Sequence, residues 1–166
     1  MTRFLRAALL AFAIAAVSAC GFQLRGSGQS TLPFGTMYVT QPALSPLGAE
    51  LRRYLRASGN TRLVEDPQEA QAILDVLAES RERGVLSLNS QGRIRELNLI
   101  YRVRFRVRTP AGAELLAPTE VALTRDISFN ESQVLAKERE EEILYRDMQS
   151  DAVQQILRRL AALNPT

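Results

Sequence analysis

Few residues in this chain could carry out covalent or metal chemistry. Its 166 residues include no histidine and no tryptophan, one cysteine, Cys20, and one lysine, Lys137. Histidine-based triads and the usual histidine or cysteine zinc sites are therefore excluded. No glycine-rich phosphate loop with its lysine is present, and no pair of carboxylates stands out among the many acids. The sequence predicts a protein that is not an enzyme and has no metal site or cofactor.

The single cysteine follows a segment typical of secretory signals. Arg3 and Arg6 form a short basic start, and the stretch from Ala7 to Val17 is almost entirely apolar. A membrane-spanning helix needs roughly 20 apolar residues, more than this stretch supplies. A buried core helix is the less favoured alternative, because arginines flank its start. Residues 1–19 are predicted to be a signal peptide.

The residues around Cys20 resemble the bacterial lipobox, because Val17-Ser18-Ala19 stand directly before it. In a lipobox the thiol is diacylated, the signal is cut before the cysteine, and the new amine is acylated. One acyl chain binds membranes only marginally, whereas three hold firmly. The alternative is an ordinary cysteine near a conventional cleavage site, but a lone exposed thiol is a liability in an oxidising compartment. Gly21 replaces the aspartate that marks inner-membrane retention in many lipoproteins, which points to the outer membrane.

The remaining charge is carried by arginine and acids in near balance. The signal contains two arginines and no acid, so the formal charge of +3 falls close to zero in the mature chain. The high pI is therefore no nucleic-acid signature, and no nucleic-acid partner is expected.

The clearest structural pattern covers residues 94–109, where side chains alternate strictly between two faces. Apolar residues occupy one face: Leu97, Leu99, Tyr101, Val103, Phe105 and Val107. The other face carries what we call the arginine row: Arg102, Arg104, Arg106 and Arg108. This is the pattern of a long strand with one buried face. Two interpretations of the row are open, contact with a partner or ligand and the favoured one, cross-strand pairing with Asp75, Glu79, Glu120 and Asp126.

The other elements are predicted around this strand. They are a tether at 20–33, a strand at 35–41, a helix from Pro46 with Ser45 as its N-cap, a strand within 72–83, a polar loop at 84–92, a strand at 119–129 and a helix at 138–163. A helical start at 67–72 competes with the second strand. The order β-α-β-β-β-α predicts one α+β domain at 34–166: a four-stranded, mostly antiparallel sheet with both helices on one face.

Parity restricts how the last two strands pair. Both place their apolar residues at odd positions, so facing residues must have numbers with an even sum. The connecting loop therefore needs an odd number of residues unless a bulge intervenes. Glu120 is then expected opposite Arg102 or Arg104.

The start of the mature chain, Cys20-Gly-Phe-Gln-Leu-Arg-Gly26, resembles that of the LptE family of outer-membrane lipoproteins. The element order, the size and the segment Leu135-Ala-Lys137-Glu before the final helix are similar to it too. The resemblance implies a non-enzymatic plug inside the LptD β-barrel. Together the two would receive lipopolysaccharide and place it in the outer leaflet. A different class remains open, a pilotin-type lipoprotein that assists another barrel or a secretin.

The resemblance also implies a basic binding site for lipopolysaccharide. One family position falls on Lys137, for which a merely solvated lysine is the alternative. The other falls near Ser90, which is not basic, with Arg93 and Arg95 close enough to substitute. Arginine suits lipid A phosphates, because its planar fork binds phosphate bidentately.

Overall fold

The computed structural model describes residues 32–163. The predicted signal, Cys20 and the tether as far as residue 31 lie outside the described residues. Residues 32–163 form a five-stranded sheet in the order β2-β1-β3-β4-β5 and two α-helices. The bounds are β1 Thr36–Val39, α2 Pro46–Ala57, β2 Arg62–Leu63, β3 Ala72–Leu88, β4 Ile94–Arg108, β5 Glu114–Ser128 and α3 Val134–Ala161.

The α+β class and the order β-α-β-β-β-α are confirmed, and the strand count needs a small correction. The fifth strand, β2, has only two residues, which is too short to show any alternation in the sequence. It pairs parallel to β1, and β1 pairs parallel to β3. The three long strands pair antiparallel, as predicted.

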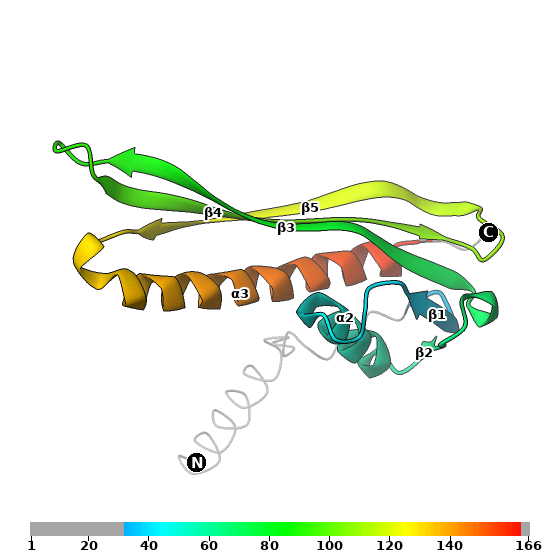
Figure 1. Cartoon of the computed structure of the whole chain (residues 1–166). Coiled ribbons are helices and arrows are strands. Elements are labelled where there is room, and N and C mark those ends of the chain that lie inside the picture. The colour runs from blue at the N-terminus through cyan, green and yellow to red at the C-terminus, as the bar shows by residue number, and fades with distance from the viewer. Residues whose placement is uncertain (1–31, 164–166) are drawn as a thin grey trace, which may run out of the picture.

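The core lies between one face of the long strands and the two helices, which lie on the same side of the sheet (Figure 1). All six predicted apolar residues of β4 are at most 5% exposed. They pack against a stripe on α3 made of Tyr145, Met148, Ala152, Val153, Ile156 and Leu160. From α2, Leu47, Leu51 and Leu55 join the same core. Burial of this apolar area is the main force that holds the helices to the sheet.

The helix boundaries follow local capping. Ser45 Oγ accepts a hydrogen bond from the Gly48 N–H at 2.9 Å, and Pro46 occupies the first turn, as predicted for α2. The last helix begins at Val134 and not at Glu138, because a 3-10 turn at Glu131–Gln133, capped by the side chain of Asn130, leads directly into it. The helical start predicted as an alternative at residues 67–72 is only a 3-10 turn at Pro67–Glu69.

A bulge in β3 explains why its alternation looked imperfect. Val76 faces Phe105 and Ala78 faces Arg104, so Leu77 has no partner in the register. Before the bulge, even-numbered residues such as Val76 lie on the face of the sheet that the helices cover, which we call the covered face. After the bulge, the odd-numbered residues lie on the covered face, so Arg81 faces Tyr101. One extra residue thus transfers charged side chains to the helix side of the sheet.

The predicted polar loop at 84–92 is shorter than expected. Strand β3 continues to Leu88, and Gly84 pairs with Asn98 inside the ladder. The turn itself is built by Asn89, whose side-chain Oδ1 accepts from the N–H groups of Gln91 and Arg93, and by Gly92 at φ 76°. Only glycine adopts such a φ without strain.

The hairpin between β4 and β5 obeys the predicted parity. Val103 faces Val121 and Arg104 faces Glu120, and the loop 109–113 has an odd number of residues. Strand β5 begins at Glu114, earlier than predicted, because irregular pairing near Val107 carries the ladder past Pro118. Within residues 32–163, neither helix has both the length and the apolar composition needed to cross a membrane.

Alanine substitutions at two adjacent residues of β4 test which face of the strand contributes more to the free energy of unfolding. Leu99→Ala should lower the free energy of unfolding by about 2–5 kcal/mol, because Leu99 is fully buried. Ile100→Ala, on the opposite face, should cost less than about 1 kcal/mol. Urea unfolding of the unlipidated chain followed by circular dichroism measures both. Equal losses would contradict the one-sided core.

Candidate functional site

Arg93 and Arg95 lie at the turn end of the β3–β4 hairpin. The Arg93 guanidinium donates to Gln91 Oε1. The Arg95 side chain is exposed and makes no ion pair or hydrogen bond with any residue of 32–163. Both line a pocket of about 220 Å³ whose other walls are Asn89, Ile94, Phe129 and Asn130. The pocket therefore combines two cations with apolar side chains.

Lys137 is neither freely solvated nor unpaired. Its Nζ donates to Ser128 Oγ at 3.1 Å and pairs with Glu140 at 2.8 Å, and its side chain is only 15% exposed. The first turn of α3 thus fixes the amine against the end of β5. To bind an anion, Lys137 must exchange Glu140 for it or share the contact.

The fold brings the three predicted binding residues to one end of the sheet. Ser128, which Lys137 contacts, is followed by Phe129, whose N–H donates to the Arg95 carbonyl at 2.8 Å. The sequence places Arg95 and Lys137 far apart, and the pairing of β4 with β5 closes that gap. We call Arg93, Arg95 and Lys137 the basic end. Such a group can bind phosphate by charge-assisted hydrogen bonds.

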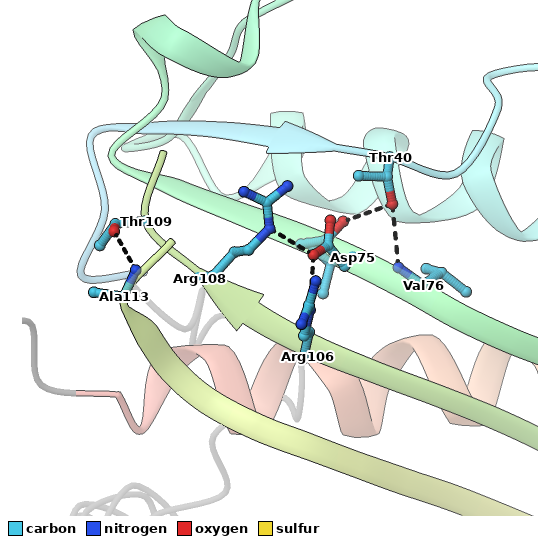
Figure 2. A network of polar contacts seen from close by, with 8 residues as sticks. Thr40, Asp75, Val76, Arg106, Arg108, Thr109 and Ala113 are labelled. Carbon is cyan, nitrogen blue, oxygen red and sulfur yellow. Dashed lines mark hydrogen bonds and ion pairs between the residues drawn. The ribbon is translucent and has the colours of Figure 1, made fainter. Parts of the chain in front are cut away.

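Asp75 organises the opposite end of the arginine row. Its Oδ2 accepts from Arg106 Nε at 2.9 Å and from Arg108 Nε at 2.7 Å (Figure 2). The Asp75 side chain is 9% exposed, whereas those of Arg106 and Arg108 are 40% and 29% exposed. A nearly buried carboxylate thus holds two arginines of one strand face, which confirms cross-strand pairing for this half of the row.

The other half is paired more loosely. Arg102 lies 3.3 Å from both Glu82 and Glu120, with all three side chains well exposed. Arg104 is exposed and has no side-chain partner among the described residues, although it faces Glu120 in the register. No helix covers this face of the sheet (Figure 1).

Two predicted partners of the row have other roles. Asp126 accepts from Asn98 at 2.6 Å. Glu79 accepts from the Tyr101 hydroxyl at 2.8 Å, because the bulge at Leu77 moves Glu79 to the covered face. Burial, and next the hydrogen bond to Glu79, raise the pKa of the Tyr101 hydroxyl above its ordinary value. The cross-strand prediction is therefore wrong for Glu79 and Asp126.

No pattern in the sequence indicates a second set of cations, Arg81 and Arg83, on the face of the sheet that the helices cover. Arg81 lies over the rings of Tyr145 and Tyr101, at 5.4 and 6.0 Å from their centroids. Arg83 pairs with Glu141 of α3 at 3.3 Å. The bulge at Leu77 is what puts Arg81 and Arg83 on that face. No three metal-ligating side chains gather anywhere in residues 32–163.

Residues 34–160 match the family model LptE, described as lipopolysaccharide-assembly. The chain belongs to the LptE family. Its resemblance at Cys20–Gly26 is thereby supported by a match over the folded part. The LptE family consists of assembly lipoproteins and not of enzymes, in agreement with the composition.

Individual LptE relatives and solved structures agree. The LPS-assembly lipoprotein LptE of Yersinia enterocolitica is 30% identical over 94% of this chain and 75% of its own length. A solution structure of an uncharacterized lipoprotein B from Nitrosomonas europaea is 44% identical, covers 86% of this chain and 91% of that one, and has a TM-score of 0.71. The crystal structure of rare lipoprotein B from Shewanella oneidensis is 30% identical over 76% and 94% of the two chains, with a TM-score of 0.67.

Removing one carboxylate partner from each half of the arginine row should distinguish the nearly buried pairing from the exposed pairing. Asp75→Asn should lower the free energy of unfolding by about 1–3 kcal/mol, because the nearly buried negative charge that pairs with two arginines is lost. Glu120→Gln, the matched control, should cost less than about 1 kcal/mol, because its pair is exposed. Denaturant unfolding measures both, and a larger loss for Glu120→Gln would contradict this account.

Proposed function

We propose that this chain is a non-enzymatic outer-membrane lipoprotein that plugs the LptD β-barrel and supports its assembly. It binds lipopolysaccharide during delivery to the outer leaflet. The observation that carries the proposal is the LptE family match over residues 34–160. Curated relatives named LPS-assembly lipoprotein LptE align with 94% of the chain, which supports the same role.

In this proposal the chain has three parts with separate duties. Residues 1–19 direct export and are removed, and Cys20 carries a diacylglycerol and an N-acyl chain. The proposal includes no other non-protein group. Residues 20–33 tether the lipid to a single domain at 34–166. The anchor keeps the domain on the periplasmic side of the outer membrane, from which it enters the barrel lumen.

The basic end is the proposed contact for lipopolysaccharide. Phosphate oxygens would meet Arg93 and Arg95, and Lys137 would exchange Glu140 for phosphate. Support comes from the pocket of about 220 Å³, where Ile94 and Phe129 lie beside the two arginines. A phosphorylated amphiphile fits this chemistry, because charge and apolar surface are adjacent.

The arginine row is proposed as a polar face toward the barrel lumen. No helix packs on that side of the sheet (Figure 1), and acids already pair three of its four arginines. A face neutralised in this way can lie against polar lumen side chains without an unpaired charge apart from Arg104.

Affinity purification tests the partner. The outer membrane is solubilised in mild detergent, and the full-length chain is recovered through a tag after Thr166. We expect a large barrel with a lipopolysaccharide-transport jellyroll domain, in about equal amount, identified by mass spectrometry. Recovery of a secretin, or of no large partner, would contradict the proposal and favour the pilotin-type alternative.

Charge reversal at the basic end tests the ligand site separately. Lys137→Glu and Arg95→Glu should each weaken binding of purified lipopolysaccharide about tenfold, because one phosphate contact becomes a repulsion. Both variants should still recover the barrel. Arg56→Glu, the same charge change in the last turn of α2, is the matched control and should bind normally. Unchanged binding by both reversed variants would show that the basic end is only surface charge.

A further inference from the structure

One edge of β3 is unpaired over most of its length. Strand β1 reaches only as far as Val39, which faces Leu74, and Thr40 Oγ1 then accepts the Val76 N–H at 3.2 Å. From Leu77 to Leu88 no strand within residues 32–163 pairs with β3 on that side. Figure 1 shows β1 beside only the first part of β3. An unpaired edge presents a row of free backbone donors and acceptors.

The edge of β5, on the far side of the sheet, differs in sequence. Pro118 lies inside β5 and cannot donate a ladder hydrogen bond, which protects an edge from pairing. Strand β3 contains no proline, and its stretch from Gly84 to Leu88 contains no charged residue. Three of its apolar side chains are more than half exposed there: Val85, Leu86 and Leu88. The β3 edge is therefore the one suited to pairing.

A groove accompanies this edge on the helix side. One pocket of about 590 Å³ lies between α2, α3 and β3, and a second of about 390 Å³ continues along α3. Arg81 and Glu142 line both of them. Arg83 joins the second pocket to a third of about 260 Å³ that reaches Val85 and Phe129. The shared residues indicate one continuous groove of about the length of the unpaired edge.

The groove suits a polypeptide better than an acyl chain. Charged side chains line its two larger pockets, and an acyl chain there would take water away from these charges without offering them any hydrogen bond. The Tyr145 hydroxyl already donates to the Glu82 backbone carbonyl at 2.6 Å. This hydroxyl shows that a β3 backbone carbonyl can accept a hydrogen bond from a group outside the β3–β4 ladder. The backbone N–H groups of an added strand would supply such donors along the whole edge.

Arg81 indicates the charge of the occupant. The other arginines of the two larger pockets are paired with carboxylates: Arg53 with Glu50, Arg83 with Glu141 and Arg146 with Glu142. Arg81 has only ring contacts with Tyr101 and Tyr145 within the described part of the chain. An acidic side chain on the occupant would complete this pattern.

We propose that the β3 edge from Leu77 to Leu88 accepts an extended segment of a partner protein as an added strand, with an acidic side chain of that segment at Arg81. The chain's own segment before Leu32 is a poorer occupant. Leu32 is held by Asn60, and β1 runs parallel to β3, so the chain enters the fold at the start of β3 and away from Leu88. The proposal does not depend on which barrel the chain serves.

Register-resolved photo-crosslinking in the native host tests this with the full-length lipidated chain. A photo-reactive amino acid replaces Ser80, Glu82 or Gly84 in turn. The last position has room, since a Cβ there would meet only the Asn98 carbonyl, at 4.0 Å. We expect the crosslinked residue of the partner to move by two positions for each step along β3, because side chains on one face of paired strands advance together. Ala122 and Thr124 of β5 are control positions and should give no such stepping.

Substitutions at Arg81 test the charge. Arg81→Glu should lower the crosslink yield at Glu82 about fivefold, the factor expected when one exposed ion pair is lost. Arg81→Lys should retain most of the yield, and immunoblotting confirms equal amounts of each variant in the membrane. The proposal is overturned by crosslinks without stepping, by no crosslink, by crosslinks to residues 20–31 or to a second copy, or by an unchanged yield in Arg81→Glu.

Discussion

A β-strand turns successive side chains to opposite faces, and β4 obeys this rule from Leu97 to Arg108 without interruption. That constraint determines which face of the sheet the helices cover and which face carries the arginines. Every odd residue from Leu97 to Val107 needs a cover, which α3 and α2 provide from one side. Every even residue from Arg102 to Arg108 is an arginine, and these side chains must face away from the core. One strand thus separates the apolar interior from the charged surface.

Much of the fold could be predicted because its signals are local or strictly periodic. Ser45 and Pro46 mark the start of α2 through capping chemistry, and the odd apolar positions of β4 and β5 restrict their register to facing residues whose numbers have an even sum. The features that were missed have no such signal. The bulge at Leu77 is visible only in the pairing of β3 with β4, and Gly84 continues a strand although glycine usually weakens one. Two-residue β2 depends on β1 for its existence.

The candidate site divides in the same way. The family resemblance suggested Lys137, Arg93 and Arg95 as binding candidates, but only the pairing of β5 with β4 brings Lys137 toward Arg95. The contact of Lys137 with Glu140 could not be foreseen, because acids crowd that helix turn. Asp75 was foreseen as a partner of the arginine row, whereas its double role toward Arg106 and Arg108 depends on register. Arg81 reached the covered face through the bulge alone.

The central claim is that this LptE-family chain serves the placement of lipopolysaccharide in the outer leaflet. The most direct test is to deplete the chain in its own host and pulse-label lipopolysaccharide. Surface-accessible label is then measured against total label. The account predicts that newly made lipopolysaccharide stops reaching the surface while older surface material remains, and that re-expression of the full-length chain restores delivery. Undiminished arrival of new lipopolysaccharide at the surface after depletion would contradict it.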